Sequence, residues 1–171
     1  LYDTRIRPKP STIALEMVDA SAMLWRLNLL GVDVTKRCEA LAEEWAPQSD
    51  DRHYAFNDCH AAMAFVGAGR FADAERVVKN LEAAARGSGT NARMSADVGV
   101  PLARGLLAFG RGDYTAAVNA ILPIRAIAIR FGGSHAQRDV LSLTALEAAI
   151  RSGQRSLAQG LAAERLAIKP H

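Results

Sequence analysis

The chain has 171 residues, of which half are hydrophobic and 6% aromatic, and it carries a net charge of +3. This length suits one compact domain or an array of four two-helix units. Basic residues are scattered rather than gathered in a stripe with interleaved aromatics, so we expect no nucleic-acid partner. Two cysteines in predicted helices and no secretory or bilayer-spanning run indicate a cytoplasmic protein with reduced thiols and no membrane partner.

The first unit is predicted over 11–46. Before it, 2–10 contains two prolines and is expected to be an extended entry segment. Ser11 is expected to be the N-cap of a helix that runs to about Leu30, with apolar residues such as Trp25 recurring at spacings of three and four. Gly31 ends this helix, and a second helix is expected over 34–45.

The second unit is predicted over 53–86, with helices near 53–66 and 71–86. Its two helices meet at Gly69. The following segment, 86–91, is rich in glycine, but no Gly-Lys-Ser/Thr follows, so it is not a phosphate-binding loop.

The third unit is predicted over 97–131, with helices near 98–109 and 113–130 on either side of Gly112. Pro123 lies inside the second helix and should kink it, because proline lacks the N–H and clashes with the carbonyl four residues back.

The fourth unit is predicted over 134–168, after Gly132-Gly133. Ser134 and Gln137 match a capping box, in which the serine caps the new helix and the glutamine reaches back. Helices are expected over 135–152 and 154–168, with Gly153 between them.

A glycine that recurs about every forty residues therefore organises the chain. Gly31, Gly69, Gly112 and Gly153 each end one apolar helical stretch and precede another. Such a repeated helix–turn–helix is typical of an α-solenoid. The predicted fold is all-α, an α-α superhelix of about four units in a single domain over 1–171.

The third unit fits the tetratricopeptide pattern best. With Gly112-Asp113-Tyr114 as the turn, Gly105 and Ala117 occupy the small positions where the paired helices cross. Further segments show a closer resemblance: Met17-Val-Asp-Ala-Ser21, Leu24-Trp-Arg-Leu27, Phe56-Asn-Asp58, Phe65-Val-Gly-Ala-Gly-Arg70 and above all Gly132-Gly-Ser-His-Ala-Gln-Arg-Asp139.

On these segments the chain resembles the tetratricopeptide repeat protein 38 family over nearly its whole length. The resemblance implies a solenoid of the tetratricopeptide type. Because family members are longer, it also implies that this chain corresponds to their C-terminal part. It implies no catalytic residues.

Polar function is concentrated at the start of the fourth unit, where a helix N-terminus presents free N–H groups. The candidate binding residues there are Ser134, His135, Gln137, Arg138 and Asp139. In a solenoid the first helices of successive units line the concave surface, so neighbouring first helices could contribute further residues. Those candidates are Asp19, Arg26, Asp58 and His60.

The ordinary alternative is that Ser134 and Gln137 only cap the helix and that His135 fills its first turn. His135 and Asp139 are four residues apart and could co-ligate a metal or form an ion pair. No metal, cofactor or catalytic motif has the required spacing, so we expect none.

Three hypotheses about function follow. The first is a non-catalytic scaffold that holds a protein or peptide partner in a concave groove. The second is an enzyme or small-molecule binder that uses His60, His135 and Asp139. The third is a structural module that forms a homo-oligomer.

Overall fold

The computed structural model describes residues 1–51 and 54–168, and within them the fold is all-α, with no strand. His53, the first residue of the predicted second unit, lies outside the described residues. Most predicted helices are present with ends shifted by one to three residues. The helices are η1 (Tyr2–Ile6), α1 (Ala14–Leu29), α2 (Thr35–Trp45), η2 (Ala46–Gln48), α3 (Ala55–Gly67), α4 (Phe71–Ala85), α5 (Thr90–Met94), η3 (Ser95–Gly99), α6 (Val100–Gly110), α7 (Tyr114–Ile121), η4 (Leu122–Phe131), α8 (His135–Arg151) and α9 (Arg155–Ile168).

Four helical hairpins are joined by the recurring glycines, as the sequence predicts. Gly31, Gly69, Gly112 and Gly153 have φ values of 79°, 70°, 80° and 73°. At each of them a Cβ would meet nothing within 4 Å. Glycine is therefore needed for its left-handed backbone conformation and not for lack of space.

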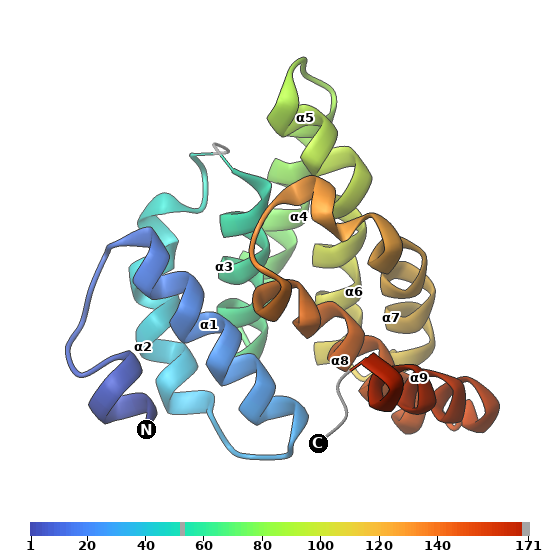
Figure 1. Ribbon diagram of the computed structural model, residues 1–171. Helices are drawn as coiled ribbons and strands as arrows, with labels where there is room; N and C mark the ends of the chain where they lie inside the picture. Colours follow the sequence, from blue (N-terminus) through green and yellow to red (C-terminus); the bar gives the residue numbers. More distant parts are fainter. Residues whose placement is uncertain (52–53, 169–171) are drawn as a thin grey trace.

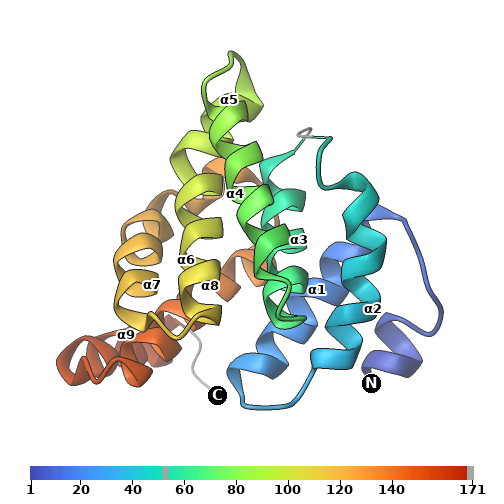
Figure 2. The same cartoon turned by 180° about the vertical axis from the view of Figure 1, so that it is seen from behind.

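The hairpins pack in chain order. The second helix of each pair contacts the first helix of the next: α2 lies on α3, α4 on α6, and α7 on α8. Figure 2 shows α3, α4 and α6 side by side on the rear face. Each hairpin thus buries one side against its neighbour, which gives a continuous core.

The first and fourth hairpins also meet directly. Figure 1 shows α1 beside α8, and the two helices are in contact. The indole N–H of Trp25 on α1 donates to the hydroxyl of Thr144 on α8 at 2.9 Å. The same Trp25 ring lies 5.6 Å from the ring of Phe109 on α6. Side chains of three first helices therefore fill the space where these helices meet.

The chain start differs from the prediction. Instead of an extended segment, Tyr2–Ile6 forms a π-helical turn, in which the carbonyl of Tyr2 accepts from the N–H of Arg7 at 2.8 Å. Tyr2 is buried, and burial of its ring favours this compact turn over an extended strand. Ser11 does not cap α1, because its hydroxyl accepts from the N–H of Ile13 and the helix begins only at Ala14.

Pro123 changes the helix type. The α-helix α7 ends at Ile121, and the chain continues as the 3₁₀ helix η4 with Pro123 in its first turn. Because proline has no N–H to donate to the carbonyl four residues back, the tighter coil replaces the α-helix. The sequence predicts a kink at Pro123, and what the structure shows at this point is a change from an α-helix to a 3₁₀ helix.

One stretch, Tyr114–Phe131, is by length and composition able to cross a membrane, although no such run was expected from the sequence. A single stretch of this kind is weak evidence for a membrane span. Two of its basic residues pair with carboxylates elsewhere in the fold: Arg125 with Glu164, and Arg130 with Asp97. These ion pairs join the stretch to α9 and to η3.

Candidate functional site

The loop before α8 lies tightly against the start of α3. Gly132 and Gly133 have φ values of 88° and 76°. A Cβ at Gly132 would overlap the hydroxyl of Tyr54, and one at Gly133 would overlap the ring of Phe56. Unlike the hairpin glycines, these two are required both for conformation and for close approach.

The predicted capping box is present at the start of α8. The Ser134 hydroxyl accepts from the N–H of Gln137 at 3.2 Å, and the Gln137 side-chain oxygen accepts from the N–H of Ser134 at 2.8 Å. Both side chains are used to satisfy helix N–H groups, as the ordinary interpretation holds. They hold the helix start in place and leave recognition to their neighbours.

Two arginines fix the same region from different sides. Arg138 donates to the carbonyl oxygens of Gly132, at 3.2 Å, and of Gly133. Arg26 reaches from α1 and donates to the carbonyl of Ala136 in the first turn of α8. Their guanidinium groups therefore bind main-chain carbonyls and tie the loop and α1 to α8.

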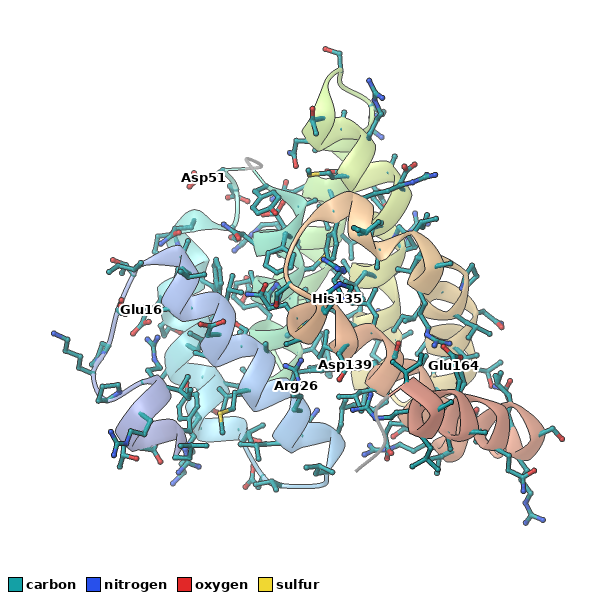
Figure 3. All side chains as sticks on the ribbon, viewed as in Figure 1. Glu16, Arg26, Asp51, His135, Asp139 and Glu164 are labelled. Carbon is teal, nitrogen blue, oxygen red and sulfur yellow. The ribbon has the colours of Figure 1, made fainter. Side chains whose placement is uncertain are left out.

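Asp139 lies at this α1–α8 junction and forms a bidentate ion pair with Arg165 of α9, at 2.7 and 3.2 Å. Figure 3 shows Arg26, His135 and Asp139 grouped where the two helices meet. Burial lowers the pKa of Arg26, the nearby Asp139 carboxylate opposes this, and Arg165 adds to it. Among the described residues, the guanidinium groups of Arg26 and Arg165 therefore both act on the Asp139 carboxylate.

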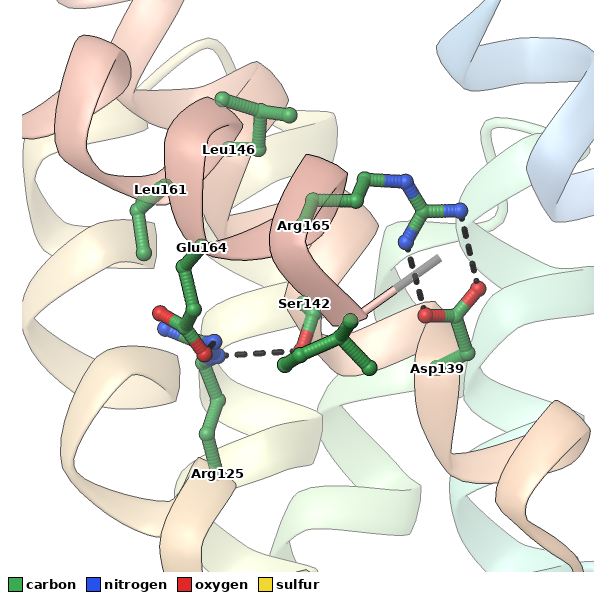
Figure 4. Close-up of a pocket in the computed structure, with 8 residues that line it drawn as sticks. Arg125, Asp139, Ser142, Leu146, Leu161, Glu164 and Arg165 are labelled. Atoms are coloured by element: carbon green, nitrogen blue, oxygen red, sulfur yellow. Dashed lines mark hydrogen bonds and ion pairs between the residues drawn. The ribbon is translucent and has the colours of Figure 1, made fainter. Parts of the chain in front are cut away.

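A small cavity of about 40 Å³ lies beside this ion pair, between η4, α8 and α9 (Figure 4). Arg125 on its wall donates to the Ser142 hydroxyl at 3.0 Å and pairs with Glu164. The space is enough for about one water molecule. Because its charged groups are paired with each other, we interpret the cavity as the junction that fastens α9.

The two histidines of the candidate set have opposite surroundings. His135 is exposed, whereas His60 is 1% exposed inside the core. The Nδ1 of His60 lies 2.7 Å from the carbonyl oxygen of Phe56, and its Nε2 has no partner among the described residues. Burial lowers the pKa of His60 to about 4, with a smaller effect of Arg26 in the same direction. His60 is therefore a neutral core side chain, and the geometry does not favour an acid–base set of His60, His135 and Asp139.

Asp58 lies elsewhere, on the first turn of α3, and lines a cavity between α2 and α3. It is 9% exposed, and its pKa is raised to about 7 by burial and, less, by the Asp51 carboxylate. Asp19 is exposed on α1. The nine candidate residues thus divide between the α1–α8 junction, the exposed side of α1, the core and this second cavity.

Sequence reasoning missed Arg165, Arg125 and Thr144. Each is an ordinary helical residue in the sequence, and each acquires its role from a partner on another helix. No local motif marks such residues, because the pairing depends on how the helices cross.

No family model matches the chain, and no solved structure matches it. The fold and its sites define an all-α protein of stacked helical hairpins, and any finer assignment depends on the geometry described above.

Proposed function

We propose that the chain is a tetratricopeptide-like helical-repeat scaffold that binds a protein or peptide partner without chemistry. Four glycine-linked hairpins, each packed on the next, support the repeat assignment. The observation that carries the binding role is the α1–α8 junction. There, exposed side chains from the first and fourth hairpins lie on a surface whose main chain is held by several hydrogen bonds.

The binding surface would run along one side of α1 and onto α8. By helical spacing, Leu15, Asp19 and Arg26 share one side of α1, and Arg26 contacts α8. Leu15 is 65% exposed, and Asp19 and His135 are exposed as well. An exposed leucine beside polar groups supplies both an apolar anchor and orientation for an extended or helical peptide.

The residues at the start of α8 fall into two groups. Some stabilise the main chain, and others have exposed side chains that a partner could contact. Arg138, Ser134 and Gln137 satisfy main-chain groups, so replacing them would alter the loop itself. His135 and Asp19 have exposed side chains and are therefore the positions at which a partner can be probed with least disturbance of the fold.

The test is site-specific photo-crosslinking in cells that express the protein. A photo-reactive amino acid replaces His135 or Asp19 and, as a control, Lys79, which is exposed on α4 of the rear face. The expected result is a discrete adduct at His135 and Asp19 but not at Lys79. Adducts only with a second copy of the chain would favour the oligomer hypothesis, and equal adducts at all three positions would contradict a specific surface.

A further inference from the structure

A cavity between α2 and α3 is separate from the α1–α8 junction. Its volume is about 100 Å³, enough for about three water molecules or for an ammonium group with a short alkyl chain. Its described walls come from the end of α2, the following turn and the start of α3. They are Trp45, Gln48, Ser49, Asp51, Tyr54, Asn57, Asp58 and Ala61.

The carboxylate of Asp58 is the unusual group in this wall. The residue is 9% exposed, yet within residues 1–51 and 54–168 its carboxylate forms no hydrogen bond or ion pair. Burying an unpaired carboxylate is costly, and a folded protein ordinarily pairs such a group or replaces it. Asp58 faces the cavity without a partner among the described residues, so a cation bound in the cavity would be a suitable counter-ion for its carboxylate.

The other polar residues of the wall contribute hydrogen-bond acceptors. Several of their donor groups already form hydrogen bonds within the protein. The Trp45 indole N–H donates to Ser21 at 2.9 Å, and the Ser49 hydroxyl donates to the carbonyl of Ala46 at 2.9 Å. The Gln48 amide N–H donates to the carbonyl of Thr12 at 3.2 Å. None of the described wall residues is basic. The described walls therefore supply no positive charge to the Asp58 carboxylate, and a positively charged donor in the cavity would complement it.

The apolar walls distinguish an organic cation from a metal ion. Trp45 and Tyr54 supply aromatic surface, and Ala61 supplies a methyl group. Aromatic rings attract alkylammonium groups, whereas a hard metal ion needs a shell of oxygen ligands. No group of three or more metal-ligating side chains is present in the part of the chain that the structure describes.

We propose that this cavity binds the primary ammonium group of a small alkylamine, with Asp58 as its counter-ion and Trp45 and Tyr54 against its alkyl chain. The site does not depend on the peptide-binding role, because it lies between the first two hairpins and uses none of the exposed residues of the α1–α8 junction.

The test is isothermal titration calorimetry of n-butylammonium chloride into the full chain at pH 8, where the Asp58 carboxyl, with its pKa near 7, is mostly ionised. We expect a dissociation constant on the order of 1–10 mM, given so small a ligand. In Asp58→Asn, which removes the charge but keeps the shape, binding should weaken at least tenfold. Glu39→Gln, the same charge change at an exposed position of α2, should leave it unchanged.

Four results would overturn the proposal. They are no heat with the wild-type chain, equal binding of uncharged n-butanol, equal loss in Glu39→Gln, and tighter binding of calcium chloride at the same ionic strength. Arg52, which lies outside the described residues, provides a further check: binding that occurs only in Arg52→Ala would make the chain's own guanidinium the cation. Circular dichroism and thermal melting of Asp58→Asn confirm that any loss of binding is not loss of fold.

Discussion

The two polar regions of this molecule differ in how their charged groups are satisfied. At the start of α8, Arg26 and Arg138 bind main-chain carbonyls, and Asp139 binds Arg165. In the α2–α3 cavity, Asp58 is buried without a hydrogen bond or ion pair to any described residue. The first region is built from interactions that hold helices together, and the second retains a group that costs stability.

This difference suits the two regions to different ligands: the start of α8 to a protein or peptide, and the α2–α3 cavity to a small cation. The start of α8 supplies a fixed surface, because its polar side chains such as Gln137 form hydrogen bonds with main-chain groups. The His135 side chain is exposed on this surface. The α2–α3 cavity supplies an unsatisfied charge, because nothing on its described walls neutralises Asp58. Changes in the first region should lower stability, whereas removal of the Asp58 charge should raise it.

The largest expected effect is that of Asp58→Asn on the pH dependence of stability. The pKa of Asp58 is raised from 3.8 to about 7 in the folded protein, so the folded state holds this proton more tightly than the unfolded state. The contribution of Asp58 to the free energy of unfolding is therefore fully present below pH 4. It is lost as the pH rises through about 7, and the total loss is roughly 4 kcal/mol. Asp58→Asn should abolish that loss and be the more stable protein at pH 8.

The measurement is urea unfolding of both proteins between pH 4.5 and 8. His60 works in the opposite direction, because its pKa is lowered from 6.5 to about 4 and its stabilising effect is lost as pH falls through that range. Since His60 is present in both proteins, the difference between their unfolding free energies isolates Asp58. A difference that does not change with pH in this range would show that the pKa of Asp58 is not raised in the folded protein.

The next largest effect is expected for Gly133→Ala. Its positive φ costs about 1–2 kcal/mol for an alanine, and the overlap of its Cβ with the Phe56 ring adds about 1–3 kcal/mol. Gly112→Ala, where only the backbone conformation is at stake, should lose only the first amount. Urea midpoints compare the two variants, and equal losses would mean that the loop does not pack on α3 as described.

Thr144→Val should cost about 1–2 kcal/mol, because the buried indole N–H of Trp25 loses its acceptor while the side-chain shape is kept. Thr115→Val, at an exposed position of α7, is the matched control and should be nearly neutral. Thermal melting of both variants measures the difference. An unchanged melting temperature for Thr144→Val would argue against direct contact of α1 with α8.

The smallest effect is expected for the Asp139–Arg165 pair, whose side chains are 14% and 32% exposed. A double-mutant cycle with Asp139→Asn and Arg165→Gln should give a coupling of about 0.5–1 kcal/mol that decreases in high salt. A coupling of several kcal/mol would contradict this prediction, because it would mean that the Asp139–Arg165 pair is shielded from water like a pair in the core.

The local structure of the chain could be predicted because local chemistry decides it. The hairpin turns follow from glycine, which adopts positive φ at little cost, and the start of α8 follows from the Ser134–Gln137 capping box. Pro123 similarly ends the α-helix α7, because proline has no N–H to donate. Spacing of apolar residues located most of the helices within a few residues.

The sequence by itself thus determined an all-α chain of glycine-linked hairpins and the position of its most polar helix start. Only the tertiary structure decided that Trp25 meets Thr144, 119 residues away, that His60 is enclosed in the core, and that Asp58 is buried beside a cavity. Helical periodicity places a side chain on a face of its own helix, but burial and pairing depend on which other helix crosses that face. Those crossings follow from the packing of all the hairpins together.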